Sequence, residues 1–142
     1  MSPRWIPDPN IRRGRSVVSN LHAHLVFITK YRRGAITSDM LARLEEICHE
    51  VCHDFDVTLD EFNGEDDHIH ILIQYPPTVQ LSKLVNALKG VTSRKIREEF
   101  SSHTQKYLWG NHFWSPSYFA GSVGGAPLTV LESYIQNQKV PE

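Results

Sequence analysis

The chain has 142 residues, 40% of them hydrophobic and 22% charged, and a formal net charge of −1. These values fit one globular domain over residues 1–142 and exclude a disordered or collagen-like chain. The sequence contains no apolar run of about 18 residues and no secretory signal, so we expect a cytoplasmic protein without membrane contact. Its two cysteines, Cys48 and Cys52, are too few for a disulfide framework.

The charges are unevenly distributed along the chain. Residues 1–33 hold seven basic residues and one acid, and residues 83–97 hold five basic residues and no acid. Residues 39–67, between them, hold eleven acids and one base. Two basic regions on either side of an acidic one are typical of a protein that binds a polyanion and also holds a cation.

The first half of the chain predicts an arm, a strand and a helix. Residues 1–15 contain three prolines and four arginines without periodicity, which predicts a flexible basic arm. Residues 21–30 alternate and are rich in β-branched and aromatic side chains, as expected of a strand. Residues 39–55 carry apolar side chains at three-and-four spacing, which predicts an amphipathic helix capped by Thr37 or Ser38.

Four further elements follow in the same way. Residues 57–62 and 68–75 predict the second and third strands, and the second of these ends at two prolines. Residues 81–100 predict a second amphipathic helix, and a polar loop separates it from a fourth strand over residues 113–122.

The last predicted element is a helix near the C-terminus. Gly124-Gly125 predicts a flexible joint, and Pro127–Lys139 a third helix with proline in its first turn. The order βαββαβα predicts an α+β fold: a ferredoxin-like or RRM-like sandwich, with helices on one face of an antiparallel sheet and an extra C-terminal helix.

Two histidines in the third predicted strand are candidate metal ligands. Alternation places His68 and His70 on one face of the sheet and the neighbouring isoleucines on the other, so the imidazoles face the open side. Two imidazoles at this spacing can reach one divalent ion. His22-Ala23-His24 has the same spacing, so spacing alone does not choose between the pairs, although the acids before His68 favour the later one.

Two more patterns bear on chemistry. Tyr134 and Gln138 are four residues apart in the predicted C-terminal helix, so they lie on one helix face. A phenol, with a pKa of about 10, is a poor nucleophile at neutral pH unless a cation or base assists it. Cys48 and Cys52 are separated by three residues, where haem attachment needs two, and both lie on the apolar stripe of their helix, which favours packing over haem or metal binding.

Together these motifs resemble the single-tyrosine HUH transposases of the insertion-sequence 200/605 family, where HUH denotes histidine, a bulky hydrophobic residue and histidine. The resemblance rests on NLHAHLVFITKYRRGAI, DDHIHILIQYPP, LSKLVNALKGVTSRKIR, LWGNHFWSPSYFAGSVGG and YIQNQ, which occur in the family's order from about Asn20 to Gln138. His68-Ile69-His70 fits the HUH position better than the first pair, because Ala23 is not bulky.

The resemblance implies an activity and a set of site residues. Such enzymes cleave single-stranded DNA next to hairpins at transposon ends through a 5′-phosphotyrosine, then rejoin the strands as homodimers. Tyr134 would be the nucleophile, and His68, His70 and Gln138 would hold a divalent metal, Mg²⁺ or Mn²⁺. Residues 126–139 would form a mobile catalytic helix able to serve either subunit.

We expect the DNA contacts to come from basic side chains and exposed aromatic rings. The predicted phosphate contacts are Arg13, Arg15, Lys30, Arg32, Arg33, Lys83, Lys89, Arg94, Lys95 and Arg97. The candidate stacking rings are Trp109, Phe113, Trp114, Tyr118 and Phe119, more than half of which we expect in the core.

Alternative functions remain at this stage. The chain could be a domesticated, repeat-associated HUH nickase or a replication-type endonuclease, both of which share the histidines and the tyrosine. It could also be a non-catalytic RRM-like nucleic-acid-binding module. Such modules carry stacking aromatic residues on the open sheet face, where this sequence has histidines.

Overall fold

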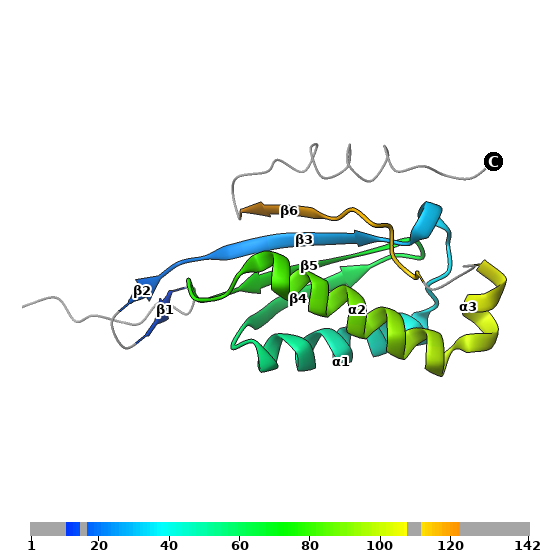
Figure 1. Ribbon diagram of the computed structural model, residues 1–142, viewed down its shortest axis with the longest axis horizontal. Helices are drawn as coiled ribbons and strands as arrows, with labels where there is room; N and C mark the ends of the chain where they lie inside the picture. The colour runs from blue at the N-terminus through cyan, green and yellow to red at the C-terminus, as the bar shows by residue number, and fades with distance from the viewer. Residues whose placement is uncertain (1–10, 15–16, 108–111, 123–142) are drawn as a thin grey trace, which may run out of the picture.

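The computed structural model describes residues 11–14, 17–107 and 112–122 (Figure 1). Its elements, in chain order, are β1 (Arg12–Arg13), β2 (Val18–Ser19), β3 (His22–Ile28), the 3₁₀ helix η1 (Lys30–Arg32), α1 (Ser38–Asp54), β4 (Thr58–Gly64), β5 (His68–Gln74), α2 (Leu81–Glu99), α3 (Ser101–Tyr107) and β6 (Phe119–Ser122). The C-terminal helix expected at Pro127–Lys139 and most of the expected basic arm lie outside the described residues.

The main sheet has four antiparallel strands in the order β4-β5-β3-β6, and β1 and β2 form a separate two-stranded sheet. Helices α1 and α2 pack together against one face of the main sheet (Figure 1). This strand order, with a helix after the first and third strands of the sheet, is the ferredoxin-like arrangement. The predicted α+β class is therefore confirmed for the described residues.

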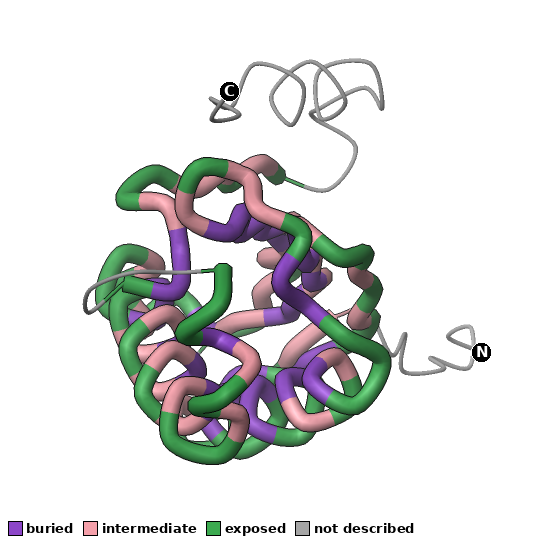
Figure 2. Tube along the Cα trace, turned by 90° about the vertical axis from the view of Figure 1, so that its right-hand side faces the viewer, coloured by how far each residue is buried: buried purple, intermediate pink, exposed green. Residues whose placement is uncertain are grey.

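The hydrophobic core lies between the sheet and the two helices. Ile69, Ile71 and Ile73 of β5 are at most 1% exposed and pack in the same cluster as Leu84 and Leu88 of α2. Figure 2 shows that buried positions of the chain face the interior, whereas exposed positions lie mainly on its outer sides. The alternation read from the sequence therefore assigns the helix-facing side of β5 correctly.

Helix α1 begins where the sequence predicts. The Thr37 hydroxyl accepts a hydrogen bond from the Met40 backbone N–H at 3.2 Å, which satisfies one of the unpaired donors of the first turn. Side-chain contacts join the two helices: Arg43 donates to Glu99 at 2.8 Å, and this hydrogen bond lowers the pKa of Glu99. The cap and these contacts fix the position of α1 over the sheet.

Two elements differ from the sequence prediction. β6 begins at Phe119 instead of residue 113, because the Phe113 and Trp114 rings are buried and Pro116 has no N–H to donate to a ladder. Residues 101–107 form α3 where we expected a loop, and Thr104 of this helix is 3% exposed. No helix in the described part of the chain is long and apolar enough to cross a membrane.

Candidate functional site

His68 and His70 lie side by side on the face of the sheet opposite the helices. Their register partners in β3 are Ile28 and Val26, which are buried but do not belong to the core cluster under the helices. The two imidazole rings are stacked, with their centroids 5.9 Å apart and an angle of 29° between their planes. The expected orientation of both histidines is thus confirmed.

A carboxylate fixes the His68 ring. Asp67 Oδ1 lies 2.8 Å from His68 Nδ1, and because a carboxylate only accepts, Nδ1 carries the proton and donates. This tautomer leaves Nε2, with its lone pair, as the nitrogen available to a metal. The other Asp67 oxygen, Oδ2, lies 3.2 Å from Arg32 Nε, so the carboxylate is held from both sides.

The backbone around Asp67 is also braced. Thr29, which is fully buried, donates from its backbone N–H to the Asp67 carbonyl at 2.9 Å, and its hydroxyl donates to Arg33 O at 2.6 Å. Tyr31 and Arg32 then adopt left-handed backbone conformations, with φ of 60° and 54°. This tight turn after β3 places Arg32 against Asp67, at some cost in backbone strain.

The surroundings of His70 favour its neutral form. Burial lowers the pKa of His70 below its ordinary value, and the neighbouring His68 and His24 lower it further. A histidine must be neutral to bind a metal through a ring nitrogen, so this environment suits a ligand.

Two acids next to the histidines were not among the ligands expected from the sequence. Glu65, Asp67 and His68 each bring one possible ligand atom within 4.8 Å of the others. Carboxylate oxygens suit a hard divalent ion such as Mg²⁺ or Mn²⁺. In the sequence, the only indication that Glu65 and Asp67 belong to the site is their position immediately before the His-x-His pattern.

Of the first histidine pair, His24 lies on the same face near His70, whose pKa it lowers, whereas His22 lies on that face at a distance. His22 is the register partner of Gln74, whereas His68 is the partner of Ile28, six residues along β3. At about 3.3 Å per residue, His22 and His68 are therefore about 20 Å apart along the strands. His22 Nδ1 lies 3.6 Å from Asp60 Oδ2, a contact far from the His68 site.

Several basic residues that we expected to contact DNA form hydrogen bonds or ion pairs within the protein. Lys89 donates to the carbonyls of Ser115 and Pro116 at 2.7 and 3.1 Å, and Lys95 Nζ lies 3.5 Å from Glu50 Oε2. The structure also places Arg32 at Asp67, as described above. The other described basic residues expected to contact DNA are exposed or half-buried: Arg13, Lys30, Arg33, Lys83, Arg94 and Arg97.

Four expected site residues lie outside the described part of the chain: Tyr134, Gln138, Arg15 and the candidate stacking residue Trp109. Among the aromatic candidates, Phe113 and Trp114 are core residues, whereas Tyr118 and Phe119 are half-buried.

Burial raises the pKa of Cys52 to about 12 and that of Cys48 further, which supports the interpretation of both thiols as packing residues.

Comparison with known sequences decides the family. The sequence model of the family described as "Transposase IS200 like" matches residues 17–138, nearly the whole chain. The chain belongs to the IS200-like transposase family. Its relatives include the ISDra2 transposase TnpA of Deinococcus radiodurans, 27% identical over 128 residues and covering 90% of this chain and 91% of that protein.

Another relative in the IS200-like family is the transposase for insertion sequence element IS200 of Salmonella typhimurium. It is 31% identical over 119 residues, which cover 84% of this chain and 77% of that protein. The family name matches the resemblance read from the sequence motifs.

Solved structures support the fold of the IS200-like chain. A crystal structure of a putative transposase from Deinococcus radiodurans superposes with a TM-score of 0.81 at 26% identity, over 92% of this chain and 99% of that one. A REP-associated tyrosine transposase bound to a REP hairpin shares the fold with a TM-score of 0.55 at 10% identity, over 89% and 69% of the two chains.

Proposed function

We propose that this IS200-like transposase cleaves and rejoins single-stranded DNA next to hairpins at transposon ends. The observation that carries the proposal is the pair His68 and His70, side by side on the open sheet face, with Asp67 hydrogen-bonded behind the first ring. Family membership supports the reaction class, and the two imidazole rings are the expected metal-binding centre for that reaction.

His68 and His70 are the proposed metal ligands, with Gln138 as the third. The environment fits a divalent ion, because His68 presents its unprotonated nitrogen away from Asp67 and His70 favours its neutral form. A bound Mg²⁺ or Mn²⁺ supplies positive charge that stabilises the developing charge on a scissile phosphate. Glu65, exposed beside Asp67, adds negative charge that attracts a cation.

Tyr134 is the proposed nucleophile. Its phenolic oxygen forms a bond to the phosphorus, its proton passes to solvent or a base, and the bond from phosphorus to the 3′ oxygen breaks. The products are a 5′-phosphotyrosine and a strand with a free 3′-hydroxyl, which takes up a proton. Rejoining is the same exchange in reverse, so no nucleotide cofactor is consumed.

The proposed DNA contacts are phosphate contacts from basic side chains at the surface. Lys83 and Arg94 are exposed on α2, and Arg13 is exposed in β1. The related REP-associated transposase is described as bound to a REP hairpin, which supports a hairpin as the DNA partner here. We further propose a homodimer in which residues 126–139 act as a mobile catalytic helix.

The experiment is a covalent-adduct assay. Protein is mixed with Mn²⁺ and labelled single-stranded oligonucleotides from the flanks of its own gene, then run on a denaturing gel. We expect a protein–DNA adduct whose formation is prevented by chelator and abolished by His68→Ala and by His70→Ala, but not by His22→Ala. No adduct on any flanking strand, or an adduct that forms normally with chelator present, would contradict the proposal.

A further inference from the structure

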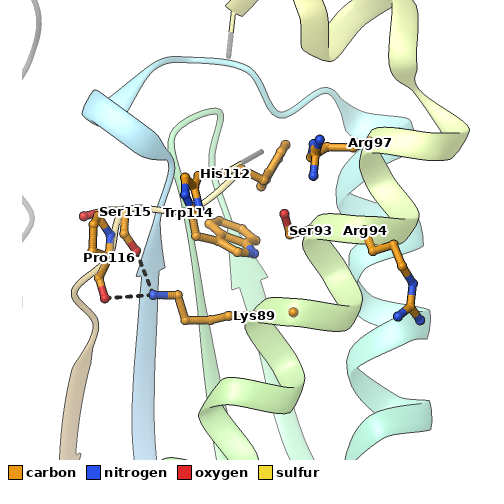
Figure 3. A pocket seen from close by; sticks show the side chains of 10 residues that line it. Lys89, Ser93, Arg94, Arg97, His112, Trp114, Ser115 and Pro116 are labelled. Carbon is orange, nitrogen blue, oxygen red and sulfur yellow. Dashed lines mark hydrogen bonds between the residues drawn. The ribbon is translucent and has the colours of Figure 1, made fainter. Parts of the chain in front are cut away.

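A concave site lies away from the histidines, on the helix side of the sheet. It has a volume of about 330 Å³ and lies between the second half of α2 and the segment that precedes β6 (Figure 3). Arg94 and Arg97 come from the helix, and His112 and Trp114 from the facing segment. No carboxylate is among the described residues that line it.

The wall opposite α2 is held in place by hydrogen bonds. The Trp114 indole N–H donates to the Thr92 hydroxyl at 2.9 Å, and the Trp114 ring meets Phe113 edge-on with centroids 4.7 Å apart. The Lys89 ammonium donates to the Ser115 and Pro116 carbonyls, as Figure 3 shows. The pocket is therefore preformed, and Lys89 acts as part of its frame.

The chemistry of the pocket suits a phosphate group. Arg94 and Arg97 are three residues apart in α2, so they lie on the same side of the helix. In Figure 3 Arg97 extends toward the facing segment, while Arg94 lies at the outer rim and points away from Trp114. The guanidinium group matches the geometry of a phosphate, and the exposed His112 adds a further donor.

Gly90 leaves one side of the pocket without a side chain. A Cβ atom added at Gly90 would have no protein atom within 4 Å, so packing does not require glycine there. Glycine is nonetheless unfavourable within a helix, where alanine is the better residue. Its bare backbone keeps open the space between α2 and the Trp114 wall.

We propose that this pocket binds one unpaired nucleotide of a DNA strand, with its phosphate at Arg97, its base against the apolar wall beside Trp114, and the adjoining phosphate of the strand at Arg94 on the outer rim. This proposal rests on the proposed function, since it adds a second contact with the same class of substrate. A base within a duplex is paired and stacked, so it cannot enter a pocket without being extruded. The pocket therefore selects single strands, at a place separate from the metal site.

The test compares the affinity of four proteins for a labelled oligothymidine strand of about ten nucleotides. Binding is followed by fluorescence anisotropy with chelator present, over a range of salt concentrations. The Arg94→Gln/Arg97→Gln double variant removes the charge, Gly90→Gln fills the pocket without changing charge, and Lys106→Gln is a control at an exposed position outside the pocket.

We expect the double variant and Gly90→Gln each to bind the strand about tenfold more weakly than wild type, and Lys106→Gln to bind as wild type does. The salt slope of the double variant should fall by about 0.7 for each lost phosphate contact. Wild-type affinity in Gly90→Gln or in the double variant would overturn the proposal. Thermal unfolding checks that each variant is folded. If the double variant is unstable, the affinity of Gly90→Gln alone tests the proposal. This variant is expected to fold, because glutamine is a better helix former than glycine.

The adduct assay described above separates this proposal from the proposed function. If wild type forms the adduct but the pocket variants bind oligothymidine normally, the proposed nucleotide-binding role of the pocket is wrong and the proposed function stands. If the pocket variants lose affinity but wild type forms no adduct, the function is wrong and the nucleotide site stands.

Discussion

The carboxylate of Asp67 accepts a hydrogen bond from His68 Nδ1 at 2.8 Å, while its second oxygen lies 3.2 Å from Arg32 Nε. One side chain therefore sets both the tautomer and the orientation of a proposed metal ligand. Carboxylates behind ligating histidines are a common means of fixing the ring and increasing its basicity. Asp67 is a positioning residue in this account, because it acts on the metal through His68.

Removal of the carboxylate should weaken metal binding. We expect Asp67→Ala to reduce the affinity for Mn²⁺ by about ten- to 100-fold, the usual cost of losing such a partner. Isothermal titration of the protein with Mn²⁺ measures this directly. Asp66→Ala is the matched control, since the only described bond from Asp66 to a neighbouring element uses its backbone carbonyl. Equal Mn²⁺ affinity in Asp67→Ala and wild type would refute the positioning role.

Protonation of His70 should require a lower pH than protonation of an ordinary histidine. Burial is the main reason, because it disfavours the charged imidazole in the folded protein. The unfolded chain, with a histidine pKa of about 6.5, then binds the proton more readily. The contribution of His70 to stability is therefore intact above that pH and falls as the pH drops toward the lower, folded-state pKa.

An NMR titration of the metal-free protein tests the His70 prediction. The His70 ring resonances should shift with a midpoint below about 6.5. A midpoint at or above that value would show that the environment of His70 does not favour the neutral form.

Lys89 should contribute to stability through its ammonium group. Lys89→Met keeps most of the apolar stem but removes the donor that binds the Ser115 and Pro116 carbonyls. We expect a loss of about 2 kcal/mol in the free energy of unfolding, typical of hydrogen bonds from a charged group. Urea denaturation measures it, with the exposed Lys83→Met as control. A change no larger than that of the control would argue against the bracing role.

The two cysteines should be unreactive in the folded protein. Cys48 and Cys52 are 0% and 1% exposed, and burial raises the pKa of both thiols, that of Cys52 to about 12. Because the thiolate is the reactive form, iodoacetamide near neutral pH should modify neither thiol until denaturant is added. Mass spectrometry of the intact protein counts the modified thiols, and rapid alkylation of native protein would contradict this packing.

Much of the fold could be predicted from the sequence, because its patterns are local. Alternation over residues 68–73 separates the core isoleucines from the open-face histidines, and the Thr37 cap marks the start of α1. The start of β6 could not be predicted in the same way. Trp114 is held by Thr92 on α2, a distant contact that overrides the strand propensity of its own segment.

The candidate site was partly predictable for similar reasons. His68 and His70 form a motif with a fixed spacing, so the sequence alone locates them. The role of Asp67 depends on a turn after β3 that brings Arg32 to it, and the engagement of Lys89 depends on a segment 26 residues away. Such pairings are set by tertiary structure, and no local pattern identifies them.

The most direct test of the central claim is the identity of the residue joined to DNA. A labelled single strand from the gene's flank is incubated with wild type, Tyr134→Phe and the control Tyr107→Phe, and each adduct is digested and sequenced by mass spectrometry. We predict a DNA-bearing peptide that contains Tyr134 in wild type and in Tyr107→Phe, and no adduct in Tyr134→Phe, which keeps the ring but lacks the attacking oxygen. An adduct that persists in Tyr134→Phe, or one attached to another residue in wild type, would contradict the account.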